Sequence, residues 1–178
     1  MTSKSLNVHR VSMYLGESFG QSFPSLLDGI AAVRSSQATS SDTTRFLEAA
    51  ALRLHGWAVT LMGQSHFEEA ATLAEHALWA SRHAHGERHE DTVSLMGVLG
   101  AALAAQGKHG DAEVHQTTAL LVSRETLGDH HTTTRVAKHA LVMTLNAQGK
   151  HAEADALRGN VDAPAPASYV SPLVAAMA

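Results

Sequence analysis

The sequence predicts an all-α fold built from repeated helical hairpins, and three observations support this prediction. A repeat of 42 residues runs through most of the 178-residue chain. Leucines within a copy recur at the spacing of one helix face, as at Leu95, Leu99 and Leu103. Aromatic residues make up only 4% of the chain, whereas alanine occupies 31 positions. This composition favours closely packed helices over a β-sandwich.

The repeat shows as identities at an offset of 42 residues. A leucine, a glutamine and an alanine recur in all three copies: Leu61, Leu103 and Leu145; Gln64, Gln106 and Gln148; Ala70, Ala112 and Ala154. The five residues 105–109 are identical to residues 147–151. A fixed period of this length is the signature of stacked supersecondary units that bury a shared core.

Each copy is predicted to form two antiparallel helices, and the third copy is truncated. The expected helices lie near residues 43–63 and 66–85, 91–106 and 109–127, and 133–148 and 151–159. Gly107 is expected to end the first helix of the second copy, and Gly128 the second helix. A hydroxyl of Thr132, Thr133 or Thr134 can cap the helix that follows. Ala70, Ala112 and Ala154 are expected to be buried where two helices cross.

The repeat resembles the tetratricopeptide repeat, in its 42-residue variety similar to kinesin light chain. The family's pattern of small, large, Gly, aromatic and Ala positions corresponds to Gly100, Leu103, Gly107, His109 and Ala112. Its Leu-Gly-x-x-His-Pro-x-Thr connection corresponds to residues 127–134, without the proline. The resemblance covers residues 43–160 and implies a right-handed superhelix of three hairpins, which usually binds another protein.

The resemblance also implies which side chains face the concave groove of such a superhelix. The expected partner-binding residues are Leu52, His55, Val59, Met62, Gly97, Ala101, Ala104, Val136, His139, Met143 and Asn146. This set is mostly apolar, with two imidazoles and one amide. It lacks the Lys and Arg side chains that grip a carboxylate. We therefore expect an apolar helix or extended peptide as the partner.

The two ends of the chain do not follow the repeat. Residues 1–42 are expected to form a degenerate helical hairpin that covers the first repeat, with Pro24 opening its second helix near Ser22. Residues 35–42 are expected to be a linker and helix cap. Residues 161–178 form a Pro- and Ala-rich tail that can dock on the repeats. One alternative is that either end fills the groove.

Two motifs suggest catalysis or metal binding. Residues 16–20 fit the Gly-x-Ser-x-Gly nucleophile elbow, but that motif needs a parallel sheet, and the repeats leave no sequence for one. A turn between helices is the expected structure there. His83, His85 and His89 cluster near acidic residues, yet neighbours two apart on a helix point about 200° apart. We expect no catalytic residue, metal site or cofactor.

Composition excludes several other classes of protein. The formal net charge of −4 disfavours nucleic-acid binding, and the absence of cysteine excludes disulfides and thiolate chemistry. No run of 18 apolar residues or signal-peptide core is present. The sequence thus predicts a cytoplasmic protein, with an alanine content that fits a bacterial source.

We therefore expect a non-catalytic scaffold for protein–protein interaction, compatible with a homodimer. The alternative is a small-molecule-binding protein or enzyme that uses the groove histidines His55 and His139.

Overall fold

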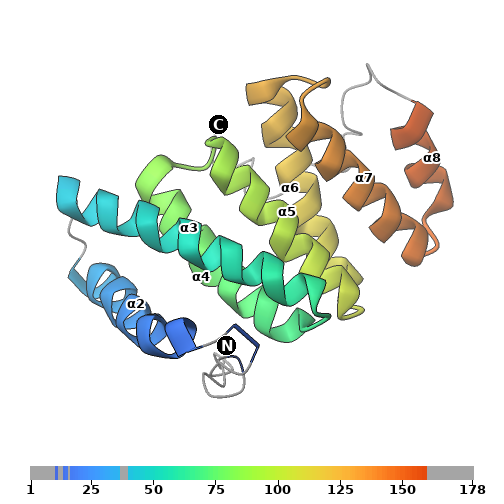
Figure 1. Cartoon of the computed structure of the whole chain (residues 1–178). Helices are drawn as coiled ribbons and strands as arrows, with labels where there is room; N and C mark the ends of the chain where they lie inside the picture. Colours follow the sequence, from blue (N-terminus) through green and yellow to red (C-terminus); the bar gives the residue numbers. More distant parts are fainter. Residues whose placement is uncertain (1–10, 12–13, 16, 37–39, 160–178) are drawn as a thin grey trace. The chain divides into compact units, whose positions relative to one another are not determined.

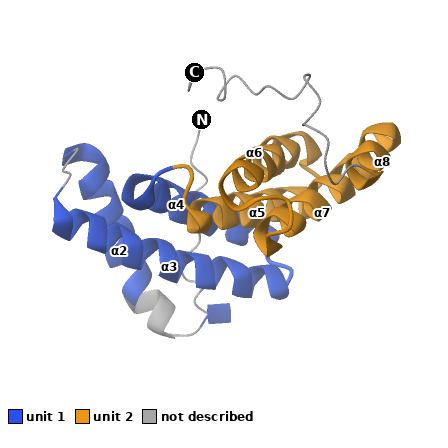
Figure 2. Cartoon of the chain, turned by 90° about the horizontal axis from the view of Figure 1, so that it is seen from above, with its two compact units in different colours: residues 1–86 blue, residues 87–178 orange. Residues whose placement is uncertain are grey.

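A computed structural model of the chain describes residues 11, 14–15, 17–36 and 40–159. The chain divides into two compact units, Met1–Gly86 and Glu87–Ala178 (Figure 2). Within the described residues all regular structure is helical, which confirms the predicted all-α class. None of the described helices is both long and apolar enough to cross a membrane.

The helices form hairpins in each unit (Figure 1). Those of the first unit are α2 (Glu17–Ser36), α3 (Ser41–Gly63) and α4 (Phe67–His85). Those of the second unit are α5 (Glu90–Ala105), α6 (His109–Leu127), α7 (Thr132–Ala147) and α8 (His151–Gly159). The bounds of α3 to α8 agree with the predicted helices to within two residues.

In the first unit, α3 and α4 pack along their length and α2 lies against this hairpin. Leu54, Leu61 and Leu73 are fully buried between the paired helices. From α2, Phe23 and Ile30 are buried as well. Residues 1–42 were expected to form a helical hairpin that covers the first repeat, and the described part of this segment contributes α2, whose buried hydrophobic side chains explain why it packs there.

In the second unit, α5 packs against α6, and α7 packs against α6, α5 and α8. Leu95, Met96 and Leu145 are almost completely buried. The repeated alanines Ala112 and Ala154, like Ala70 in the first unit, have no exposed surface. This confirms the prediction that these alanines are buried.

The turn inside each hairpin needs a backbone with positive φ. Gly107 and Gly149 adopt φ values of 76° and 77°, which L-residues with a Cβ rarely adopt. Ser65 occupies the equivalent position of the first copy, with φ of 63°. The first hairpin thus makes the same turn with a residue that is strained there.

Two expectations about α2 and its surroundings are corrected by the structure. The helix begins before Pro24, which lies inside it, because packing of the adjacent buried Phe23 outweighs the lost backbone hydrogen bond. Residues 17–20 of the Gly-x-Ser-x-Gly motif are helical rather than a turn, whereas Gly16 is outside the described residues. Val11, Tyr14 and Leu15 are helical as well. The tail of residues 161–178 also lies outside the described residues.

The helix caps are made partly by unexpected side chains. Ser40 caps α3 through its hydroxyl, which accepts a hydrogen bond from the Thr43 N–H at 3.1 Å, as expected for this segment. The cap of α7 is not one of the three threonines. Instead, His131 Nδ1 accepts from the Thr133 N–H at 3.3 Å. His89 caps α5 in the same way, through the Asp91 N–H.

Candidate binding face of the repeat hairpins

The eleven predicted groove residues lie on the first helix of each hairpin, at spacings of three and four residues. In the first unit they form the α3 face, which consists of Leu52, His55, Val59 and Met62. In the second unit they form the α5 face (Gly97, Ala101 and Ala104) and the α7 face (Val136, His139, Met143 and Asn146). At about 100° per residue, each set occupies one side of its helix.

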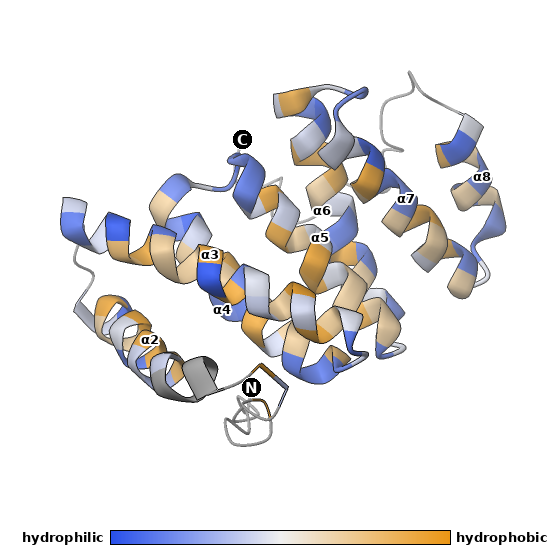
Figure 3. Cartoon of the chain, in the orientation of Figure 1, coloured by the Kyte–Doolittle hydropathy of each residue, from blue (hydrophilic) through white to orange (hydrophobic). Residues whose placement is uncertain are grey.

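The α3 face presents apolar side chains outside the buried core. Leu52 is 75% exposed and Val59 is 49% exposed, whereas His55 and Met62 are half-buried. The core-facing residues Leu54 and Leu61 lie on another side of the same helix. Figure 3 shows hydrophobic and hydrophilic residues alternating along α3.

The α7 face has the same character in the second unit. Val136 is 61% exposed and Met143 is 57% exposed, and His139 between them is exposed. Asn146 differs from these residues because its amide is engaged. Its Nδ2 donates to the Val142 carbonyl at 2.9 Å, and its Oδ1 lies 3.1 Å from His151 Nδ1.

The α5 face is made of small residues, next to α7 within the same unit. Gly97, Ala101 and Ala104 are half-buried. A Cβ placed on Gly97 would meet no atom within 4 Å. The second unit therefore brings together seven of the predicted residues on two neighbouring helices, whereas the four on α3 belong to the first unit.

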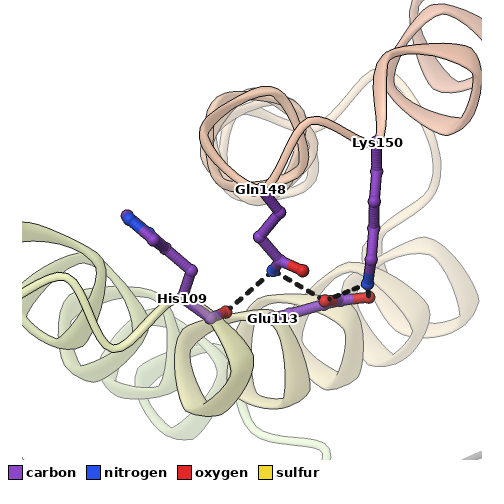
Figure 4. A network of polar contacts seen from close by, with 4 residues as sticks. All are labelled: His109, Glu113, Gln148 and Lys150. Carbon is purple, nitrogen blue, oxygen red and sulfur yellow. Dashed lines mark hydrogen bonds and ion pairs between the residues drawn. The ribbon is translucent and has the colours of Figure 1, made fainter.

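Sequence reasoning missed a polar cluster in the second unit, here called the Glu113 clasp, in which Glu113 contacts Gln148 and Lys150. Gln148 Nε2 donates to the His109 carbonyl at 3.0 Å and to Glu113 Oε2 at 2.7 Å, and Lys150 Nζ also lies 2.7 Å from that oxygen (Figure 4). Glu113 is only 15% exposed, so the carboxylate holds the turn between α7 and α8 from a partly buried position. The repeated Gln106 and Gln148 were the available signal for this contact.

The histidines near the helix connections have structural partners. His83 Nδ1 lies 2.8 Å from the Trp79 carbonyl, and His85 Nδ1 lies 3.9 Å from Glu48 Oε1. His89 is committed to the cap of α5. His109 is half-buried, as expected for the aromatic position of the repeat, but His151 at the equivalent position is exposed because it begins the last described helix.

A comparison with known families identifies part of the chain. Residues 96–157 match the family model of the tetratricopeptide repeat. The segment consists of tetratricopeptide repeats. The match covers most of α5, all of α6 and α7, and most of α8, which are the hairpins that carry the α5 and α7 faces. A search of curated proteins finds no match to the chain.

Proposed function

We propose that this chain is a non-catalytic interaction module that binds an apolar helix or extended peptide of another protein. Tetratricopeptide repeats generally mediate protein–protein interaction. The proposal assigns the binding to the first helices of the hairpins, through the α3, α5 and α7 faces. It includes all eleven predicted residues.

The pattern of exposed apolar side chains is the observation that carries this proposal. Among the described residues, six large hydrophobic side chains are exposed: Tyr14, Leu52, Val59, Val114, Val136 and Met143. Four of these six lie on the α3 and α7 faces, at equivalent positions of the first and third copies. Burying them against a partner yields about 25 cal/mol per Å² of apolar surface.

The small residues of the α5 face add room for a partner. Because Gly97 has open space where a Cβ would lie, a bound side chain can approach the α5 backbone closely. Val136 and Met143 on the neighbouring α7 then supply apolar contact beside it. The space at the α5 face, bordered by apolar side chains, therefore suits a bulky apolar side chain of the partner better than a polar side chain.

The chemistry of the eleven positions favours an apolar partner over an acidic one. None of them is Lys, Arg, Asp or Glu. A groove that holds a carboxylate-rich peptide needs basic side chains at such positions. The alternative of an enzyme built on His55 and His139 has no specific support, since His139 is exposed on the α7 face.

The experiment is affinity capture from the native host followed by mass spectrometry, with the full chain and two variants as bait. Val136→Asp combined with Met143→Asp places charges on the α7 face. Val114→Asp is the matched control, because Val114 is 51% exposed but lies on α6. We expect the double variant to lose a partner that the parent and the control retain. Equal capture by all three, with unchanged helical circular dichroism, would contradict the proposal.

A further inference from the structure

A cluster of basic and aromatic side chains joins the end of α2 to α4 in the first unit. The Arg34 guanidinium lies over the Trp79 ring, 4.3 Å from its centroid. The same tryptophan stacks with His83 at a centroid separation of 3.9 Å. His76 precedes Trp79 by three residues on α4, so the two side chains lie on the same side of this helix. Arg34 is thus a cation that lies over an attracting aromatic ring, one helical turn along α4 from a histidine that can become charged.

His76 is held in a neutral state by its surroundings. The side chain is half-buried, and its Nδ1 is buried without a hydrogen-bond partner among the described residues. Burial lowers the pKa of His76, and the positive charge of Arg34 lowers it further. Protonation therefore places a second positive charge beside Arg34.

Other charged groups near this surface have different partners or lie farther along the helices. On α4, Glu69 and His83 stand seven residues before and after His76, on the same side of the helix. Glu69 is 7% exposed and His83 is engaged with Trp79. From α3, Glu48 faces His85 near the end of α4. Arg34 is the charged group from α2 that acts on His76.

We propose that Arg34 and His76 form an acid-sensitive latch that holds the C-terminal end of α2 against the first hairpin and releases it when His76 is protonated. In neutral solution Arg34 rests on Trp79 without repulsion. In acid, the two cations repel each other in a partly desolvated site, and separation of α2 from α4 relieves this repulsion.

The direction of the effect follows from proton linkage. In the open form His76 is solvated and titrates near its ordinary pKa of about 6.5, whereas in the closed form its pKa is lower. The open form consequently binds more protons as the pH falls below about 6.5. Acid therefore shifts the population toward the open form, and the closed form is favoured above that pH.

Opening the latch exposes apolar surface. Phe23, Leu26 and Ile30 of α2 are buried in the closed form. Gly29 approaches the Phe46 ring of α3 so closely that a Cβ there would lie 2.3 Å from its Cζ. Release of α2 uncovers both sides of this contact.

The test uses single cysteines in a chain that has none of its own. Ile30→Cys places a thiol on the buried side of α2, where Ile30 is 1% exposed. Ala31→Cys places a thiol at the next residue, which is exposed. The ratio of their labelling rates with a maleimide cancels the intrinsic effect of pH on the thiol. This ratio is measured from about pH 7.5 to about pH 5 in the parent, in His76→Gln and in Arg34→Gln.

We expect the ratio to rise several-fold with acid in the parent, to stay constant in His76→Gln, and to rise less in Arg34→Gln, where burial alone lowers the pKa of His76. His83→Gln, which keeps His76 and Arg34, should retain the rise. A constant ratio in the parent, or the same rise in His76→Gln, would overturn the latch. Arg34 is exposed, so Arg34→Gln is expected to fold like the parent. Its smaller acid response therefore still tests the latch if His76→Gln perturbs folding.

Discussion

At the scale of single residues, small side chains determine how closely the helices of a hairpin approach. A Cβ on Gly100 would lie 2.7 Å from Gln116 Cγ and 3.3 Å from the Ala112 carbonyl oxygen. Ala112 itself has no exposed surface, so α5 and α6 meet almost backbone to backbone. Close packing of this kind leaves no room for added methyl groups.

Ala112→Leu is therefore expected to destabilise the second unit by about 1–3 kcal/mol, because the larger side chain overpacks the crossing of α5 and α6. Urea unfolding followed by circular dichroism measures the change. Val114→Leu is the matched control, since Val114 lies two residues farther along the same helix and is 51% exposed. An unchanged midpoint for Ala112→Leu would show that the helix register is wrong.

Ser65→Gly is expected to stabilise the first unit. The left-handed conformation at φ of 63° costs an L-residue about 1–2 kcal/mol, and glycine avoids this cost. Greater freedom of glycine in the unfolded chain offsets about 0.5–1 kcal/mol, which leaves a net gain of up to about 1.5 kcal/mol. Thermal unfolding tests this, with the reverse change Gly107→Ser expected to destabilise. A lower melting temperature for Ser65→Gly would contradict the strain assigned to this turn.

At the scale of helices, contacts between hairpins hold elements that are too short to be stable alone. α8 has nine residues and buries only Ala154 among its described side chains. An isolated helix of this length is marginal in water. The contacts of Glu113 with Gln148 and Lys150 fix the turn from which α8 begins.

Glu113→Ala is expected to loosen α8, because it leaves Gln148 and Lys150 without this partner. The cost is about 1–3 kcal/mol for the unpaired polar groups. Hydrogen exchange of residues 151–159 should become faster. Glu125→Ala is the control, since its ion pair with Arg88 is between side chains that are more than half exposed and is worth at most about 1 kcal/mol. Equal exchange in both variants would show that the clasp does not support α8.

The sequence predicted these helices well because their evidence is local. Leucine spacing and the 42-residue repeat located α3 to α8, and Gly107 and Gly128 marked helix ends correctly. The start of α2 was missed because burial of Phe23, rather than local preference, extends that helix to the N-terminal side of Pro24. The Glu113 clasp and the contact of Arg34 with Trp79 were missed because each joins residues far apart in the chain.

At the scale of the whole molecule, the repeat continues through both compact units. The first copy lies in the first unit, and the second and third copies lie in the second unit. The α3 and α7 faces therefore present the same pattern of exposed apolar side chains in different units. This recurrence is the reason for assigning binding to the first helix of each hairpin rather than to α4, α6 or α8.

The most direct test of this assignment is titration calorimetry of the captured partner with Ala101→Trp. Ala101 lies in the middle of the α5 face, and a tryptophan there would fill the space left by Gly97 and its small neighbours. Val114→Trp on α6 is the control. We predict that Ala101→Trp abolishes binding while its helical circular dichroism is retained, and that Val114→Trp binds like the parent. Binding of Ala101→Trp with parental affinity would contradict the account and exclude this face as the binding site.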